Sequence, residues 1–410
     1  MLLGEKITKS KLAPCQRFDA LKTFFFPAFV FQMRTEQLSK CDMKIVDDFM
    51  RPLIKDTLYL DDYAANDYLY GSTKMVLFGI PKLADEVDIM MIDNAFKLLS
   101  SKDIRIHVLA WEDILEHITI RTGLEPSPSL IENVFNGVQD EEGKKVCKTI
   151  KESLRTCLAN NLIAKPSQGV AIEVSALHPA SSHFLRNGDY TSFADWRFIH
   201  RARLNLLRLN GNTPWDSALS NCRRCHAPNE STLHVLSLCK PNMGRRTERH
   251  NAIVERIHKA TRRDWKTFSK NQALGDSRLR PDLVLHKGKD EALILGITIP
   301  YENRLQAFDS ARAEKERKYA NIASLLSQDF KKVSVQAIVV GALGSWDPKN
   351  DAVLKKFTNK KYAKLLRKLC VSDAISHSRK IFQKHVIGYI PSDRQLHDRQ
   401  ATSCSRKVRN

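Results

Sequence analysis

Four potential metal ligands within eighteen residues place the strongest constraint on what this sequence can fold into. Cys222, Cys225, His234 and Cys239 follow the spacing C-x2-C-x8-H-x4-C. Two cysteines at this separation can present both sulfur atoms to one ion, and zinc is bound tetrahedrally by thiolates and imidazole. A Cys₃His set leaves no coordination position open, so the spacing predicts a structural zinc knuckle over residues 221–240. Because so short a segment has no core of its own, the metal would supply its folding energy.

The other cysteines do not indicate a disulfide framework. The chain has nine cysteines, an odd number, and no secretory signal, which favours a reducing compartment and a metal site. His226 is a competing ligand, but it directly follows Cys225 and could hardly reach the same ion. The longest apolar run, Phe24 to Phe31, contains Pro27 and is far too short to cross a bilayer. We therefore expect no membrane partner.

The positive charge lies entirely in the second half of the chain, whose total net charge is +20. Residues 1–200 contain 24 Lys+Arg against 27 Asp+Glu, a net of −3, whereas residues 201–410 contain 42 against 19, a net of +23. A segregated basic excess is typical of a surface that binds a polyanion. We therefore expect DNA or RNA as the partner. The clusters Lys355-Lys356 and Lys360-Lys361 are compatible with nuclear import.

Apolar periodicity predicts a multidomain protein with a helical first part and a mixed second part. The stretch from Trp196 to Leu209 has two interpretations: a core-facing helix with a solvated basic side, or a helix lying along a phosphate backbone. The predicted parts are a helical region over 1–120, a helical linker region over 121–220, the knuckle over 221–240, an α/β domain with a basic helical tail over 241–390, and a disordered basic tail over 391–410.

The pattern after residue 279 predicts an α/β core. A short apolar run at 283–285, a turn at 287–290 and a branched segment at 292–299 predict a β-hairpin with at least one buried strand. A helical pattern follows over about 303–328, and then a buried strand over 333–340. The order strand, strand, helix, strand is typical of an α/β domain.

A candidate nuclease site lies at the start of this hairpin. Restriction-like nucleases place one acid at the end of a strand and a second on the next strand. Both acids hold a divalent cation such as Mg²⁺, which polarises a phosphate and activates water. Asp282 fits the first acid. Lys315 shares a helix face with Tyr319 and Ile322, so it should point toward the sheet and support developing charge.

Together these features resemble the restriction-like-endonuclease class of non-long-terminal-repeat retrotransposons, which insert into ribosomal RNA genes. The resemblance covers roughly residues 195–390. More faintly, the first 110 residues resemble the reverse-transcriptase thumb of such elements, from Pro14-x-Gln16-Arg17 to Gly79-Ile80-Pro81. Beyond the knuckle, the motifs are Gly244-Arg245-Arg246, Arg249-His250-Asn251, Arg280-Pro281-Asp282-Leu283-Val284, Thr298-Ile299-Pro300-Tyr301-Glu302, Glu314-Lys315-Glu316-Arg317-Lys318-Tyr319 and Gly341-Ala342-Leu343-Gly344-Ser345-Trp346.

The resemblance implies the C-terminal part of a reverse-transcriptase polyprotein whose PD-(D/E)xK domain nicks a DNA target. The element's own RNA would be a further partner, and the protein would act in the nucleus. The residues expected to contact nucleic acid are Arg201, Arg203, Arg245, Arg246, Arg249, His250 and Arg280.

The sequence departs from this family in two places. Tyr59-Leu60-Asp61-Asp62 imitates the polymerase box, but only 58 residues precede it, too few for a palm and fingers. The thumb alignment places it in a helix-to-loop passage. Gly296 stands fourteen residues after Asp282, where the family carries its second catalytic acid. We therefore expect a degenerate nuclease, or alternatively an active Mg²⁺-dependent nickase that uses Glu291 or Glu302 as the second acid.

Overall fold

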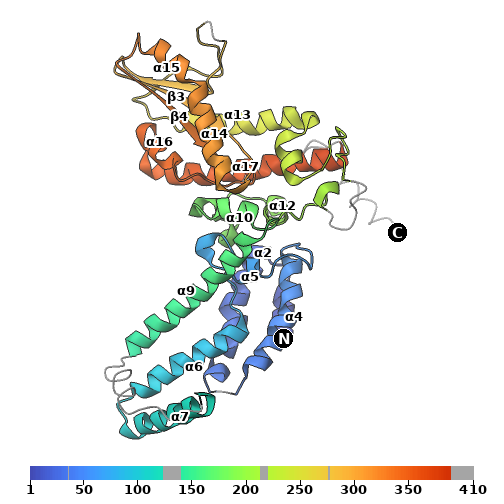
Figure 1. Ribbon diagram of the computed structural model, residues 1–410, viewed down its shortest axis with the longest axis vertical. Helices are drawn as coiled ribbons and strands as arrows, with labels where there is room; N and C mark the ends of the chain where they lie inside the picture. Colours follow the sequence, from blue (N-terminus) through green and yellow to red (C-terminus); the bar gives the residue numbers. More distant parts are fainter. Residues whose placement is uncertain (36, 123–139, 213–219, 276–277, 389–410) are drawn as a thin grey trace, which may run out of the picture. The chain divides into compact units, whose positions relative to one another are not determined.

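The computed structural model describes residues 1–35, 37–122, 140–212, 220–275 and 278–388. They divide into two compact units, one formed by residues 1–165 with 185–187 and the other by 166–184 with the residues from 188 onward. This division differs from the expected one because helix α9 (Asp140–Ala164) packs against α6 (Leu83–Leu99) in the first unit (Figure 1). The expected tail over 391–410 lies outside the described residues.

The first unit is helical, as its periodicity predicted. Helix α4 (Lys40–Thr57) begins at Ser39, whose side chain accepts a hydrogen bond from the backbone of Asp42, a capping arrangement that satisfies an orphan N–H group. The buried face of α4 packs against α6, and Asp47 accepts hydrogen bonds from the first two N–H groups of α6 at 2.9 Å. The other helices are α1 (Leu2–Thr8), α2 (Pro14–Ala20), α3 (Val30–Arg34), α5 (Asp67–Tyr70) and α7 (Ile104–Thr122).

The imitation polymerase box lies just after the end of α4. Tyr59 is exposed and has a positive φ of 56°, and Leu60 is buried. The segment is therefore a turn that leaves the helix, as the thumb alignment predicted, and it is not a strand loop that presents two carboxylates.

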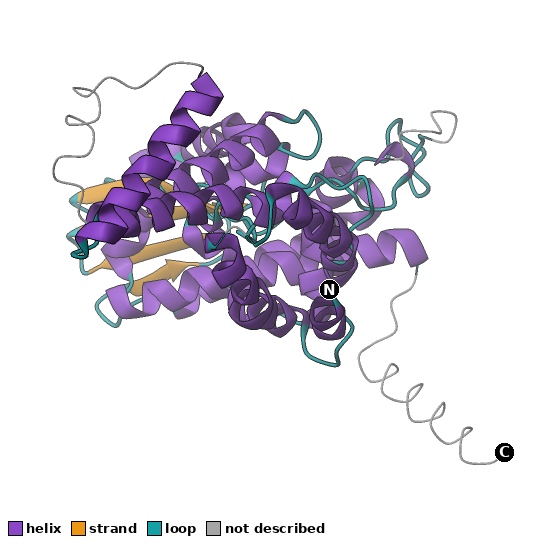
Figure 2. Cartoon of the chain, turned by 90° about the horizontal axis from the view of Figure 1, so that it is seen from below, coloured by secondary structure: helices purple, strands orange, loops and turns teal. Residues whose placement is uncertain are grey.

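The second unit contains one four-stranded sheet, drawn in orange in Figure 2. Strands β1 (Lys266–Ser269), β2 (Leu283–Lys287) and β3 (Glu291–Thr298) pair antiparallel in sequence order, and β4 (Lys332–Val339) pairs parallel with β3. The hairpin and the last strand lie within a few residues of the expected positions, whereas β1 was not expected. Parallel pairing requires a crossover, which is formed by α14 (Arg304–Lys318) and α15 (Ala320–Leu326).

The crossover helices cover one face of this sheet. Alternate residues of the central strands, including Val284 and Ile294, form a buried cluster with Tyr319, Ile322 and Phe330. Burial on both sides explains why β3 reads as a continuous apolar run and not as an alternating one. The remaining helices of this unit are α10 (Val170–Ser175), α12 (Phe193–Arg203), α13 (Met243–Lys259), α16 (Asn350–Phe357) and α17 (Lys360–Ile387), with short turns η4 (Pro179–Ser182), η7 (His234–Leu238) and η8 (Lys240–Asn242).

One side of helix α12 faces the core, and contact of its basic side with a phosphate backbone stays a prediction. Trp196, Ile199 and Ala202 are at most 2% exposed.

In the part of the chain that the structure describes, no helix is both long and apolar enough to span a bilayer.

Candidate functional site

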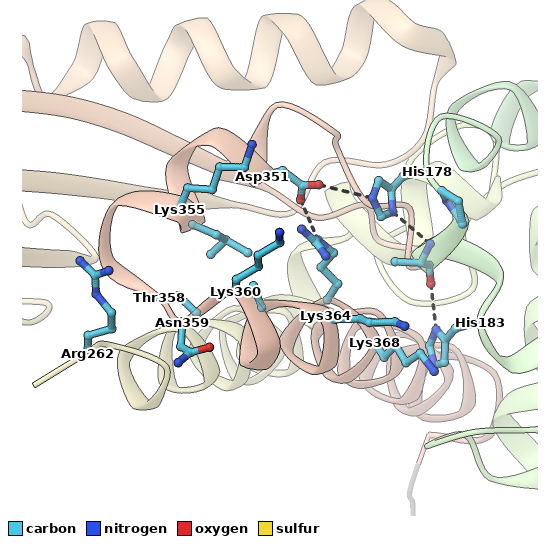
Figure 3. A pocket seen from close by; sticks show the side chains of 15 residues that line it. His178, His183, Arg262, Asp351, Lys355, Thr358, Asn359, Lys360, Lys364 and Lys368 are labelled. Atoms are coloured by element: carbon cyan, nitrogen blue, oxygen red, sulfur yellow. Dashed lines mark hydrogen bonds and ion pairs between the residues drawn. The ribbon is translucent and has the colours of Figure 1, made fainter.

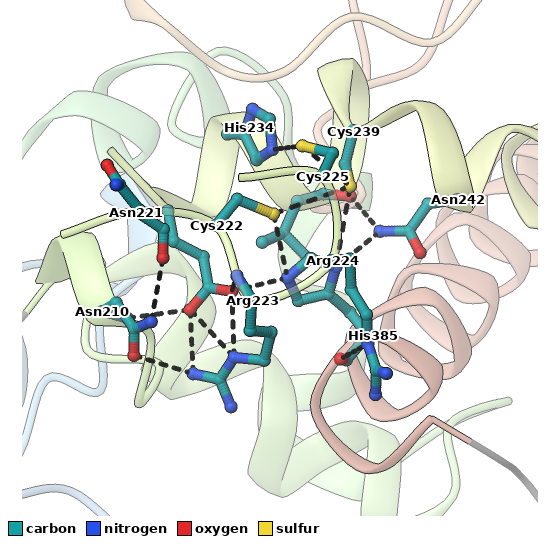
Figure 4. Close-up of polar contacts among 12 residues, drawn as sticks. Asn210, Asn221, Cys222, Arg223, Arg224, Cys225, His234, Cys239, Asn242 and His385 are labelled. Atoms are coloured by element: carbon teal, nitrogen blue, oxygen red, sulfur yellow. Dashed lines mark hydrogen bonds and ion pairs between the residues drawn. The ribbon is translucent and has the colours of Figure 1, made fainter. Parts of the chain in front are cut away.

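The four predicted knuckle ligands converge on one point in the second unit (Figure 4). Their ligand atoms all lie within 4.8 Å of one another. The Cys239 sulfur is 3.9 Å from the sulfurs of both Cys222 and Cys225, and the Cys225 sulfur is 3.2 Å from His234 Nε2. In a tetrahedral zinc site with bonds of about 2.3 Å to sulfur and about 2.0 Å to nitrogen, neighbouring ligand atoms lie roughly 3.5–3.8 Å apart. The observed separations are close to these values.

The electrostatics of the cluster also fit a bound cation. Burial and the adjacent Cys222 thiol raise the pKa of Cys239 to about 12. Three thiolates cannot coexist at this separation unless a positive ion compensates their charge. His226 is exposed and stands outside the cluster, which agrees with the argument that it could hardly reach the same ion.

The end of helix α17 supplies a supporting residue that the sequence analysis missed. His385 is completely buried, and its ring nitrogens lie 3.7 Å from the Cys222 sulfur and 3.8 Å from the Cys239 sulfur. Asn242 donates to His385 Nδ1 at 3.1 Å, so the Nε2–H group donates to Glu230 at 2.8 Å. His385 follows Cys239 by 146 residues, and no local spacing could have revealed it.

Glu230 links this histidine to the knuckle loop. Burial opposes ionisation of Glu230, but Arg223 and the backbone N–H groups of Asn210 and Arg223 outweigh it and lower the pKa of Glu230 to about 2. Arg224 in turn donates to the backbone oxygen of His385 at 2.6 Å. The knuckle is therefore attached to α17 by a charged, hydrogen-bonded network and is not a free-standing module.

Asp282, the predicted first acid, immediately precedes β2 and is almost fully buried. Its Oδ2 atom accepts hydrogen bonds from the backbone N–H of Ile297 at 2.6 Å and from the Lys315 ammonium at 3.0 Å. His250 Nε2 on α13 lies 3.2 Å from Oδ1. Lys315 therefore points toward the site, as its helical spacing predicted. His250 was expected to contact nucleic acid but faces this carboxylate.

The three donors keep the carboxylate charged. Burial alone would raise the pKa of Asp282, but the His250 hydrogen bond and the Lys315 charge lower it below its ordinary value. Burial would lower the pKa of His250, but its pairing with Asp282 raises it. The site thus contains a charged carboxylate, an ammonium group and an imidazole whose pKa is raised by its pairing with Asp282.

Gly296 occupies the position opposite Asp282. Leu283 pairs with Leu295, so the next pair along the two strands is Asp282 and Gly296. A Cβ atom at Gly296 would lie 3.1 Å from the Tyr319 ring and 3.2 Å from the Lys315 side chain. The stem of Lys315 therefore lies close against this position, and a side chain added there would require a shift of a few tenths of an ångström.

Neither proposed replacement acid fits this position. Glu291 lies at the far end of β3, five residues from Gly296, which is about 17 Å along an extended strand. Glu302 is completely buried and accepts hydrogen bonds from the backbone of Leu343 at 2.8 Å and of Ser345 at 3.1 Å. Its carboxylate closes the 341–345 loop. Both positions count against the expectation of a displaced second acid.

Burial corrects the expected roles of two arginines. Arg203 is 2% exposed and donates to the backbone oxygens of Ser181 at 2.7 Å and Leu343 at 2.9 Å. Arg249 is 3% exposed and donates to the Ser378 hydroxyl at 2.8 Å, and burial lowers its pKa to about 10. These guanidinium groups form hydrogen bonds within the interior, so they cannot contact a phosphate.

The other expected contacts remain at the surface. Arg280 is exposed, and Arg201, Arg245 and Arg246 are half-buried. Arg245 forms an ion pair with Glu248 at 2.7 Å. The structure leaves these four side chains as candidates for nucleic-acid contact, but it does not gather them into one site with Asp282.

Comparisons with known proteins agree with the resemblance seen in the motifs. A family model described as the T26G10.4 domain matches residues 128–206. The Retrovirus-related Pol polyprotein from type-1 retrotransposable element R2 of Popillia japonica is 23% identical over 383 residues, covering 90% of this chain and 74% of that protein. The protein of the same name from Nasonia vitripennis is 24% identical over 373 residues, covering 86% of this chain and 32% of that protein.

The similarity extends along nearly the whole chain and defines a class of mobile-element proteins. The chain is related to the Pol polyproteins of non-long-terminal-repeat retrotransposons of the R2 type. It spans about a third of the length of the Nasonia vitripennis relative.

Proposed function

We propose that this chain is a nucleic-acid-binding segment of a retrotransposon polyprotein that has a restriction-endonuclease-like domain but does not cleave. The observation that carries the proposal is the isolation of Asp282. Among the described residues, no second carboxylate pairs with its partners Lys315 and His250, and Gly296 stands opposite. DNA and the element's RNA are the proposed partners, and the nucleus is the proposed location.

A lone carboxylate is poorly suited to catalysis by a metal ion. Mg²⁺ requires a near-octahedral shell of oxygen ligands and usually one or two carboxylates. The ion must also sit where it both activates water and holds the phosphate. At Asp282 it would compete with an ammonium group and an imidazole for the same oxygen atoms. Misplacement by about 1 Å can cost ~100-fold in rate.

The knuckle is proposed to hold one structural zinc ion through Cys222, Cys225, His234 and Cys239. The support is the convergence of the four ligand atoms, all within 4.8 Å of one another, and the hydrogen-bonded network that links the knuckle to α17. A closed Cys₃His set contributes to folding and leaves no position for a reacting water. Zinc would stabilise the fold, and Mg²⁺ would be needed only if the nuclease were active.

Two measurements on the purified chain test the proposal. Binding to a labelled DNA duplex and to an RNA of equal length should weaken steeply with salt, since each neutralised phosphate releases counterions. Supercoiled plasmid with Mg²⁺ or Mn²⁺ should be nicked no faster than by the Asp282→Asn variant. Absence of salt-dependent binding would contradict the binding function. Nicking that Asp282→Asn abolishes would establish the active nickase instead.

A further inference from the structure

A strongly basic cleft lies in the second unit, between turn η4 and helices α16 and α17 (Figure 3). Its volume is about 990 Å³. It shares no lining residue with the knuckle or with the Asp282 cluster. The basic side chains that line it are Arg262, Lys355, Lys360, Lys364, Arg367 and Lys368.

Asp351 is the one acidic residue among those lining the basic cleft, and its charge is already compensated. Its carboxylate accepts hydrogen bonds from Arg367 Nε at 2.7 Å and from the Trp346 ring at 3.0 Å, and His178 lies 3.5 Å away. Burial lowers the pKa of His178, so this histidine adds no positive charge at neutral pH. The cleft therefore keeps a large positive excess.

Three lysines account for most of this excess. Arg262 pairs with Asp264, and Lys368 pairs with Asp189 at 3.2 Å. Lys355, Lys360 and Lys364 are exposed, and none of them pairs with an acidic group within the described residues. Concave surfaces lined by one sign of charge concentrate the electric field and attract the opposite charge.

The cations of α17 that line the cleft follow one another along a single face of the helix. Lys360, Lys364, Arg367 and Lys368 stand at i, i+4, i+7 and i+8, so they share one face of the helix. From Lys360 to Lys368 the helix rises roughly 12 Å, and Lys355 on α16 lines the same cleft. Like charges four residues apart destabilise a helix. An extended anion bound along this face would therefore relieve the repulsion between these cations.

We propose that the basic cleft binds the phosphodiester backbone of nucleic acid without reading its sequence. The inference rests on the proposed nucleic-acid-binding function and assigns that function a location. Ammonium groups act as point charges that fit phosphate oxygens from many directions, and backbone contacts position a protein without carrying sequence information.

The test compares two variants that remove equal charge from the full chain. Lys360→Ala/Lys364→Ala removes two unpaired cations from the cleft. Lys289→Ala/Lys361→Ala removes two exposed lysines that do not line it. Affinity for a labelled duplex DNA and for an RNA of equal length is measured from 50 to 200 mM salt. Retained affinity in Lys360→Arg/Lys364→Arg, together with unchanged circular dichroism, would attribute any loss to charge and not to misfolding.

The expected result is a loss confined to the cleft variant on both nucleic acids. Its salt slope should fall by about two, because each phosphate contact contributes close to one unit. The ratio of wild-type to variant affinity should then be roughly tenfold larger at 50 mM than at 200 mM salt. If the wild-type chain binds but both double-alanine variants behave alike, the cleft assignment is wrong and the binding function stands. If the wild-type chain does not bind, both proposals fail.

Discussion

Restoring an acid at Gly296 should convert the nuclease-like site into a working one. In Gly296→Asp the new Cβ atom would meet Tyr319 at 3.1 Å and Lys315 at 3.2 Å, so these side chains must move by a few tenths of an ångström. Overpacking of this kind typically costs about 1–3 kcal/mol. Replacing a glycine within a strand stabilises the folded state by roughly 0.5–1 kcal/mol. The net effect should be a destabilisation of about 1–2 kcal/mol, which the fold can tolerate.

The catalytic gain should be much larger than this cost. The new carboxylate would stand opposite Asp282 and give a divalent ion the paired oxygens that it needs. Nicking of supercoiled plasmid in Mg²⁺ should rise on the order of 100-fold, the penalty expected for a badly placed reacting group.

The matched control is Gly296→Asn, which has the same size without the charge and should remain inactive. Adding Asp282→Ala to Gly296→Asp should abolish the gain. A folded Gly296→Asp variant that fails to nick would refute the reasoning, as would equal nicking by Gly296→Asn.

Three further predictions concern the knuckle and the buried charges. Metal analysis should find one zinc per wild-type chain and none in Cys225→Ser; a metal-free wild-type protein would contradict the site. Chelator competition should show zinc affinity about 10–100-fold weaker in His385→Ala, because supporting residues orient the ligands; unchanged affinity would make His385 incidental. Denaturant unfolding should show Arg203→Met destabilised by about 1–3 kcal/mol, because the buried backbone oxygens of Ser181 and Leu343 lose their hydrogen-bond donor. Arg208→Met, at an exposed site, should change little.

The sequence by itself determined the features that depend on short spacings. The knuckle ligands lie within eighteen residues, and the turn of helix at 234–238 brings the last two together. The hairpin follows from its turn residues and branched strands, and the register of the structure places Asp282 and Gly296 opposite each other. Lys315 was oriented by helical periodicity alone. Local geometry decides all of these, because a few backbone angles fix the relation between the residues.

Only the tertiary structure decided which charged groups are free. Arg203, Arg249 and Glu302 read as functional residues in the sequence, but all three lie in the interior, where they form hydrogen bonds with backbone and hydroxyl groups. Conversely, Lys355 and Lys360 read in the sequence only as parts of two short basic clusters, and the packing of α16 and α17 brings them together with Lys364 in one cleft. The physical reason is that burial and convergence depend on which distant segments pack together. A guanidinium group can bind phosphate when it lies at the surface, whereas in the interior it forms hydrogen bonds that stabilise the fold.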